Sequence, residues 1–269
     1  MSLSLRNKLT VVLAADGMTI SLRKKGWRSP LEELGSLAVE PGNTSQAWDA
    51  VLTALGQWLA QSTWTSADAE VVVSDAFARY VLFPWPQDST KRAEIAALAR
   101  IHFDVLFGAT DREMEISWHL AEYGKDGIAC ALQRSFLESL KAVFAKNKVH
   151  LVSVETGFVR TFNTWRSRVA GNGLLVRVEN GLCVMAAIRD GLWKSIRSVK
   201  LSGDMPSSLL AAIDREIVLQ GENERTRVYL DLHTLVDTST FAQMERFHVL
   251  GRGLYGARQR KIEVTEAAG

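Results

Sequence analysis

The sequence predicts an α/β protein built from two similar lobes. Strand-like and helix-like segments alternate along both halves of the chain, which is typical of sheets covered by helices. Both halves also open with the same pattern. Two apolar strands are joined by a glycine turn, and a second glycine turn leads into a third strand. Gly17 and Gly26 in the first half match Gly181 and Gly191, about 165 residues later. This spacing favours a duplicated unit with a cleft between the copies.

Two dipeptides predict the opening hairpins. Asp16-Gly17 joins apolar segments over 11–15 and 18–22, and Asn180-Gly181 joins segments over 174–179 and 182–186. Asp-Gly and Asn-Gly favour two-residue hairpin turns, in which both residues have positive φ. We therefore expect Asp16 to be a turn residue and Glu179 to be a solvent-facing residue beside its hairpin. The antiparallel opening of each half makes each sheet mixed.

The rest of the first half follows from periodicity and chain-breaking residues. Apolar residues at helical spacing predict helices, and β-branched runs predict strands. Pro84 and Pro86 end the second strand after the first helix, and a Ser135–Glu138 capping box opens the third helix. The expected elements are a helix over 48–59 after possible caps at 43–45, strands over 70–73 and 77–83, a helix over 92–107 capped by 88–90, strands over 114–122 and 128–132, a helix over 135–145, a strand over 149–154 and a short helix over 156–165.

The second half is shorter. A loose stretch over 166–173 leads into its meander, a helix over 208–219 follows, and 228–230 is the next strand. Beyond residue 233 the pattern weakens. We predict a first lobe over 1–170 with an inserted subdomain over about 76–133, a shortened second lobe over 171–235, and a partly irregular C-terminal extension over 236–269.

The composition is that of a soluble globular protein. Apolar residues make up 47% of the 269 residues and charged residues 23%, and the net charge is +2, which gives no reason to expect a nucleic-acid partner. Cys130 and Cys183 lie in apolar runs, as expected of small buried residues in a reducing compartment. The sequence shows neither a secretory signal nor a membrane-length apolar run, so we expect a cytoplasmic protein without a membrane span.

The order of segments resembles the actin-like (ASKHA) family, and within it the type IV pilus assembly protein PilM and the cytoplasmic domain of the type II secretion protein GspL. Two strands and a proline over 71–84 precede a helix over 92–107 that ends in aromatic residues. A strand over 149–155 then enters a helix containing Arg160. The resemblance covers about residues 8–232. It implies two RNase H-like lobes, which in ATP-binding members hold the nucleotide at the two hairpin turns.

The turns lack the residues that this nucleotide site uses. The family's phosphate loops read Asp-x-Gly-x-x-Thr/Ser, with carboxylates for Mg²⁺ and glycine for close phosphate approach. With Gly17 on the motif's glycine, Ala15 takes the carboxylate position, and Val184 falls near the hydroxyl position of the second copy. Residues 228–234 lack the glycine loop that follows the family's last core strand, and Gly251-Arg252-Gly253 comes too late. We expect no cofactor and no hydrolysis.

A partner site is implied by the resemblance. PilM-like proteins hold a short segment of a membrane partner in a groove on the first lobe, and the matching region contains Tyr80, Phe83 and Trp85. Two prolines hold Trp85 outside regular structure, which suits an exposed anchor. The predicted function is a non-catalytic cytoplasmic scaffold of a pilus or secretion-type assembly. It would bind a cytoplasmic segment of an inner-membrane protein, and homo-oligomerisation stays open.

The sequence leaves two catalytic alternatives open. An actin-like ATPase with atypical loops would hold Mg-ATP through Asp16, Gly17, Glu179 and Gly181. A nuclease of the same lobe fold would gather carboxylates such as Asp16, Asp75 and Glu155 around metal ions. The five histidines show no metal-ligand spacing, so no metal site is expected. The basic residues of the C-terminal end, Arg252, Arg258, Arg260 and Lys261, are expected to be solvated.

Overall fold

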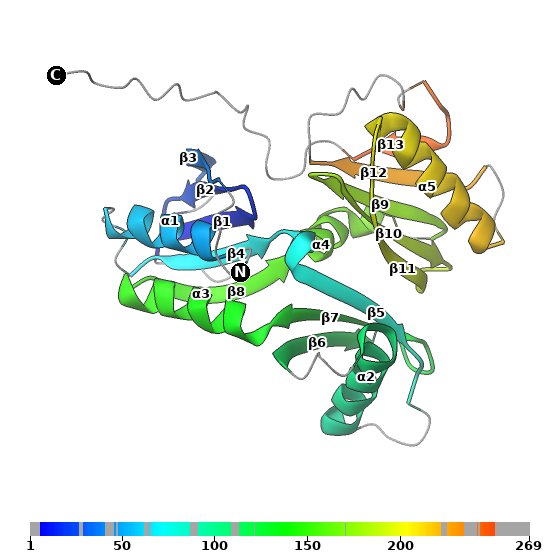
Figure 1. Ribbon diagram of the computed structural model, residues 1–269, viewed down its shortest axis with the longest axis horizontal. Helices are drawn as coiled ribbons and strands as arrows, with labels where there is room; N and C mark the ends of the chain where they lie inside the picture. Colours follow the sequence, from blue (N-terminus) through cyan, green and yellow to red (C-terminus); the bar gives the residue numbers. More distant parts are fainter. Residues whose placement is uncertain are drawn as a thin grey trace.

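The computed structural model contains two five-stranded sheets and a three-stranded sheet (Figure 1). It describes residues 6–26, 29–40, 46, 48–61, 64, 66–86, 91–108, 113–120, 122–169, 171–221, 225–233, 241 and 243–250. The predicted α/β class with two lobes, each opening with a three-stranded meander in a mixed sheet, is confirmed. The expected caps at 43–45 and 88–90, the glycines at 251–253 and the basic tail lie outside these residues.

The first lobe is built on a sheet of order β3-β2-β1-β4-β8. Its strands are β1 (Lys8–Ala14), β2 (Gly17–Arg23), β3 (Leu31–Ala38), β4 (Asp68–Val73) and β8 (His150–Thr156). The first three form the antiparallel meander, whereas β4 pairs parallel to β1 and β8 parallel to β4. Helices α1 (Asp49–Ala60) and α3 (Arg134–Lys146) pack together beside this sheet, and α4 (Gly157–Val169) lies between it and the second lobe (Figure 1).

The first hairpin turn differs from the expected Asp-Gly turn. Ala14 pairs with Gly17, so the two-residue loop consists of Ala15 and Asp16, and neither Asp16 nor Gly17 has a positive φ. Gly17 is instead required by close approach, because a Cβ atom there would lie 2.6 Å from the backbone oxygen of Leu37. The prediction of positive φ at Asp16 and Gly17 is therefore wrong.

The second hairpin turn has the expected geometry. Asn180 and Gly181 form the two-residue loop, with φ of 46° and 76°. They join β9 (Gly173–Glu179) to β10 (Leu182–Arg189), and β11 (Leu192–Lys200) completes the meander.

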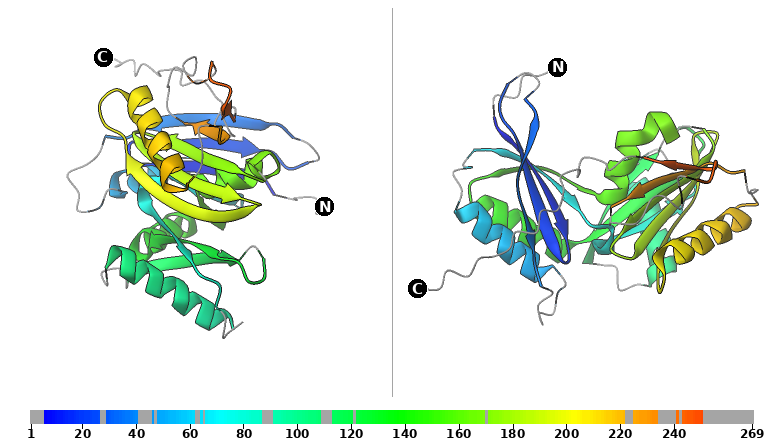
Figure 2. Two further views of the ribbon diagram at one scale, coloured as in Figure 1. Left: turned by 90° about the vertical axis from the view of Figure 1, so that its right-hand side faces the viewer. Right: turned by 90° about the horizontal axis from the view of Figure 1, so that it is seen from above.

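A subdomain is inserted between β4 and α3. It begins after the short helix η1 (Asp75–Phe77) and contains β5 (Ala78–Phe83), α2 (Arg92–Phe107), β6 (Met114–Leu120) and β7 (Gly127–Gln133). Its sheet has the order β5-β7-β6, and α2 covers one face with a small core of its own (Figure 2). Phe83 fills that core so tightly that a Cβ atom at Gly127 would lie 2.3 Å from its ring.

The second lobe repeats the plan of the first. Its sheet has the order β11-β10-β9-β12-β13, in which β12 (Val228–Leu232) pairs parallel to β9, as β4 does to β1. Helix α5 (Met205–Leu219) covers one face over a second apolar core, and Asp204 caps its N-terminus through the backbone N–H of Ser207. Strand β13 (Phe247–Val249), which the sequence did not reveal, lies within the predicted extension.

Two local predictions in the first lobe are wrong. Helix α3 begins at Arg134 after an uncapped Gln133, so Ser135 lies inside the first turn and no capping box forms there. Helix α4 continues to Val169, which shortens the expected loose stretch. Within the described residues, the chain passes from the first lobe to the second once, between α4 and β9. The predicted lobe boundaries remain predictions. Among the residues that the structure describes, no helix is long and apolar enough to cross a membrane.

Candidate functional site

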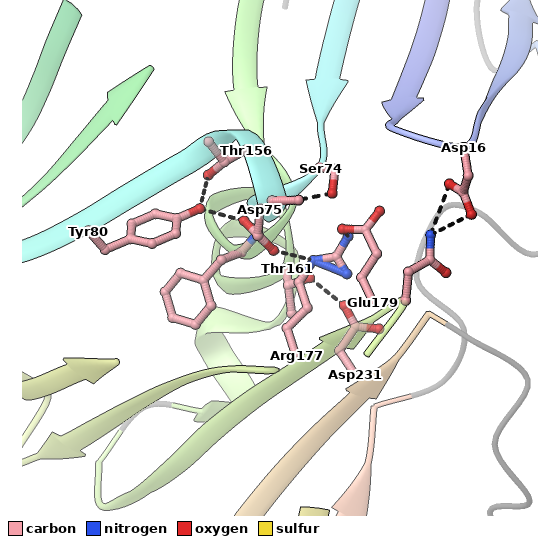
Figure 3. Close-up of polar contacts among 12 residues, drawn as sticks. Asp16, Ser74, Asp75, Tyr80, Thr156, Thr161, Arg177, Glu179 and Asp231 are labelled. Carbon is pink, nitrogen blue, oxygen red and sulfur yellow. Dashed lines mark hydrogen bonds and ion pairs between the residues drawn. The ribbon is translucent and has the colours of Figure 1, made fainter. Parts of the chain in front are cut away.

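A fully buried arginine lies where the two lobes meet. Arg177 is 1% exposed, and its Nε atom forms an ion pair with Oδ2 of Asp75 at 3.0 Å (Figure 3). Its NH2 group donates to Oε2 of Glu179 at 3.2 Å. Asp75 belongs to η1 of the first lobe, whereas Arg177 and Glu179 belong to β9 of the second. We call Asp75, Arg177 and Glu179 the interlobe charge network.

Strand alternation explains why two charged residues of β9 share one buried face. Residues two apart point to the same side of a strand, so Arg177 and Glu179 both face the first lobe. Val176 and Val178 point the other way, into the core beneath α5. Glu179 is buried, so the prediction of a solvent-facing residue is wrong. The first lobe covers this face, which local sequence does not reveal.

Asp75 has partners for its second oxygen as well. Its Oδ1 accepts the backbone N–H of Phe158 at 3.0 Å and lies 2.5 Å from the hydroxyl oxygen of Tyr80. Because a carboxylate only accepts, Tyr80 donates to Asp75, and its oxygen can then accept from Thr156, whose Oγ1 is 2.6 Å away. Burial raises the pKa of Asp75 above its ordinary value, although Arg177 and these donors act in the opposite direction.

Gly157, the first residue of α4, leaves the space that the side chain of Arg177 occupies. A Cβ atom at Gly157 would lie 2.3 Å from NH2 of Arg177 and 2.4 Å from its Nε. The guanidinium therefore lies directly against the N-terminus of α4, where only glycine leaves room for it. The N–H of the next residue, Phe158, is already taken by Asp75. The start of α4 is thus occupied by groups of the protein itself.

Strand β12 adds a second polar link between the lobes. Oγ1 of Thr161, on α4, donates to Oδ2 of Asp231, and both side chains are buried. His233 follows β12, and its pKa is lowered to about 4, chiefly by burial and then by the nearby Arg177 charge. His233 therefore stays neutral at neutral pH, beside a guanidinium that is already paired.

The two hairpin turns touch each other at their tips. Nδ2 of Asn180 lies 2.9 Å from each carboxylate oxygen of Asp16 (Figure 3). Both residues are exposed. The structure thus brings together the regions of Asp16, Gly17, Glu179 and Gly181, the residues considered for ATP. However, the carboxylate of Asp16 is bound by Asn180 and that of Glu179 by Arg177.

The carboxylates considered for a nuclease do not gather. Oε1 of Glu155 is 2.5 Å from NH2 of Arg160, which also lies 3.6 Å from Glu70, whereas Asp75 belongs to the interlobe charge network. Within the described part of the chain, no three acidic, histidine or cysteine residues are placed to hold a metal ion. Cys130 and Cys183 are both free thiols, and burial raises the pKa of each to about 12.

The residues proposed for partner binding have different environments. Tyr80 is buried and bonded to Asp75, and Phe83 is buried in the subdomain core. Trp85 is half-buried, and its ring centroid lies 4.8 Å from that of Tyr123, which is 85% exposed. Trp85 and Tyr123 thus form an aromatic pair at the end of the subdomain, beyond β5.

Comparison with known structures places the chain in the actin-like fold. No protein-family model matches the sequence, and no curated protein matches it. A Bacteroides thetaiotaomicron protein described as having an actin-like ATPase fold and unknown function aligns over 89% of this chain and 87% of its own, with a TM-score of 0.60 and 12% identity. The chain therefore has two actin-like lobes.

Two further structures with this fold come from assembly machines. The cytoplasmic domain of EpsL, an inner-membrane component of the type II secretion system of Vibrio cholerae, aligns over 91% of this chain and 90% of its own, with a TM-score of 0.56 and 13% identity. A chain of the PilM–PilN type IV pilus biogenesis complex aligns over 84% and 81%, with a TM-score of 0.59 and 13% identity. The resemblance to PilM and GspL expected from segment order is confirmed at the level of fold.

Proposed function

We propose that this protein is a non-catalytic scaffold of a pilus or secretion-type assembly, which binds a cytoplasmic segment of an inner-membrane partner. The observation that carries the proposal is the burial of Arg177 against Gly157 and between Asp75 and Glu179. In an actin-like protein that binds nucleotide, the space between the hairpin turns is needed for phosphates and metal. The similarity in fold to a chain of the PilM–PilN complex and to EpsL supports the proposal of a pilus or secretion-type assembly.

Displacing the arginine would be costly. A ligand that pushed Arg177 aside would leave Asp75 and Glu179 buried without their cation, and breaking a buried pair in this way costs about 3–5 kcal/mol. A triphosphate would also meet the carboxylates of Asp16 and Glu179 at the turns, and would need a metal ion to offset their charge. Both carboxylates are already satisfied by protein groups. Lobes joined by these buried contacts suit a scaffold.

We place the partner segment on the subdomain, with Trp85 as its anchor. Phe83 and Tyr80 fix β5 from inside, so Trp85 leaves the strand from a rigid base. Trp85 and Tyr123 offer an aromatic surface that is partly open to solvent, and such residues are enriched among those that dominate binding energy. The protein would then lie at the cytoplasmic side of the inner membrane and be held there by its partner.

Two measurements test this function. Titration with Mg-ATP should leave the melting temperature unchanged, because Arg177 and Asn180 already bind the carboxylates at the two hairpin turns. Stabilisation that grows with the logarithm of Mg-ATP concentration would contradict the proposal and favour the ATPase that uses Asp16, Gly17, Glu179 and Gly181. Cross-linking to isolated inner membranes, followed by mass spectrometry, should identify one partner whose capture is lost in Trp85→Ala. Leu37→Ala, an exposed apolar residue on β3, is the matched control and should retain capture.

A further inference from the structure

A second surface, away from Trp85, is hollowed between the subdomain and the second lobe. This groove has a volume of about 810 Å³. It is lined by residues of β5 and β11, by the last turn of α2 and by α5. Strands β5 and β11 run beside each other where the subdomain meets the second lobe (Figure 1). Trp85 is not among the residues that line the groove.

The groove follows the edges of two sheets. Residues 78–82 of β5 and 194–199 of β11 line it without interruption. Because successive residues of a strand point to opposite faces, the lining includes residues from both faces of each strand. Each strand is the last of its sheet on this side, since β5 pairs only with β7 and β11 only with β10. Such edges accept an additional extended strand through main-chain hydrogen bonds.

The lining is strongly basic. It contains four cations and one acid, whereas the whole chain has a net charge of only +2. The acid, Glu216, is buried and already bound by Ser195 at 2.6 Å and by Arg197 at 3.1 Å. Lys194 and Arg215 are exposed, and neither has an acidic partner within the described residues. Among the described residues, no carboxylate thus complements the charges of Lys194 and Arg215.

The groove also exposes large apolar side chains. Leu106 is 62% exposed and Phe107 39% at the end of α2, and Leu219 is 52% exposed at the end of α5. The guanidinium of Arg79 lies over the Phe107 ring, 4.9 Å from its centroid, so a basic and an apolar group of the lining are in contact. Apolar groups collected in one hollow are typical of interaction sites.

We propose that this groove binds an extended segment of a protein partner that carries both acidic and apolar residues. The strand edges bind its backbone, Lys194 and Arg215 bind its carboxylates, and Leu106 and Leu219 contact its apolar side chains. The proposal goes beyond the scaffold function stated above, because it assigns a second docking surface whose lining does not include Trp85. One scaffold chain could then hold two proteins at once.

Fluorescence anisotropy with labelled peptides tests the proposal. The six residues of β11 that line the groove span about 20 Å. The probe is therefore a peptide of about eight residues, about 26 Å long when extended, in which glutamate and leucine alternate. The intact chain should bind this probe and should not bind the same peptide with lysine in place of glutamate. Lys194→Glu combined with Arg215→Glu should weaken binding at least about tenfold, because two attractive pairs become repulsive. Leu106→Ser with Leu219→Ser should weaken it as well.

Matched controls separate the site from general charge. Lys141→Glu with Arg166→Glu makes the same change in net charge on exposed positions of α3 and α4, and should leave binding unchanged. Trp85→Ala should also leave peptide binding unchanged. The groove proposal and the scaffold proposal can therefore be contradicted independently of each other. Equal binding by the charge-reversed groove variant overturns the proposal. So does tighter binding of an oligodeoxythymidylate that is insensitive to the leucine substitutions, since the groove would then be a nucleic-acid site.

Discussion

Nε of Arg177 lies 3.0 Å from Oδ2 of Asp75, and this contact joins the first strand of the second lobe to the turn that ends β4 of the first. Both side chains are buried. A buried ion pair adds little stability compared with an apolar pair of the same shape. However, removing only one of its two charges is strongly destabilising. The relative position of the lobes is therefore fixed by residues that tolerate little individual change.

Replacing Arg177 by Met should lower the free energy of unfolding by about 3–5 kcal/mol, because Asp75 and Glu179 would remain buried without their cation. Urea unfolding measures the change. Lys24→Met, which removes an exposed pair with Glu32, is the control and should cost at most about 1 kcal/mol. Adding Asp75→Asn and Glu179→Gln to Arg177→Met should recover much of the loss. If the triple variant is as unstable as the single one, the cost lies in packing rather than in charge.

Gly157→Ala should destabilise the protein by about 1–3 kcal/mol, because the new methyl group overlaps the guanidinium of Arg177. Gly56→Ala, in the middle of α1, is the matched control. Its Cβ atom would lie 3.8 Å from the nearest atom, a side-chain carbon of Val143, so it should stabilise by about 0.5–1 kcal/mol through helix propensity. Thermal unfolding of both variants shows whether their effects have opposite signs. Two stabilising alanines would show that Arg177 has room to move.

His233 should make stability fall as the pH is lowered from about 6.5 to about 4. Its pKa is about 4 in the folded protein and 6.5 in the unfolded chain, so in this window the unfolded chain binds more protons. The loss is on the order of 3 kcal/mol, because each pH unit of difference between the two pKa values corresponds to about 1.4 kcal/mol. Asp75, whose folded pKa is raised, has the opposite effect and adds stability as the pH falls through that raised value toward 3.8.

The His233 effect is measured by urea unfolding at a series of pH values. His233→Asn should make the free energy of unfolding depend less on pH between 6.5 and 4, whatever the stability of this variant at pH 7. His150→Asn is the control, because His150 is exposed beside Asp68 on the surface of the first lobe. An unchanged slope in His233→Asn would mean that other groups control this window.

The Asp16–Asn180 contact should be weakly stabilising. Exposed polar pairs contribute about 0.2–1 kcal/mol. A double-mutant cycle with Asp16→Ala and Asn180→Gly measures it. Glycine is used at 180 because φ there is 46°, and alanine would add backbone strain unrelated to the contact. A coupling energy near zero would show that the turn tips merely lie beside each other.

The sequence predicted the parts of this fold that depend on local pattern. Both meanders and the helices follow from periodicity and from glycine and proline positions. The first turn lies one residue before its predicted position. The glycine at 17 is needed for close packing against the backbone of Leu37, about twenty residues later, and not for a positive φ. Strand β13 was missed because three residues with few β-branched side chains carry almost no pattern.

The charge network could not be predicted from the sequence, because its members come from separate elements. The alternation of Arg177 and Glu179 in an otherwise apolar strand is a usable signal, since charged residues two apart share a face. What that face meets is decided by the docking of the lobes. The position of Asp75 directly after β4 predicts only a turn residue, and its pairing with Arg177 depends on contacts about one hundred residues apart.

The passage between α4 and β9, which is the one passage between the lobes within the described residues, has a practical consequence for splitting the protein. A chain cut between residues 170 and 171 would yield two fragments, each with a complete five-stranded sheet, and no other described segment would be severed. Co-expressed halves should reassociate, because the Thr161–Asp231 and Asp75–Arg177 contacts orient one against the other. Such a two-piece protein would allow each half to be labelled separately for distance measurements on the assembled scaffold.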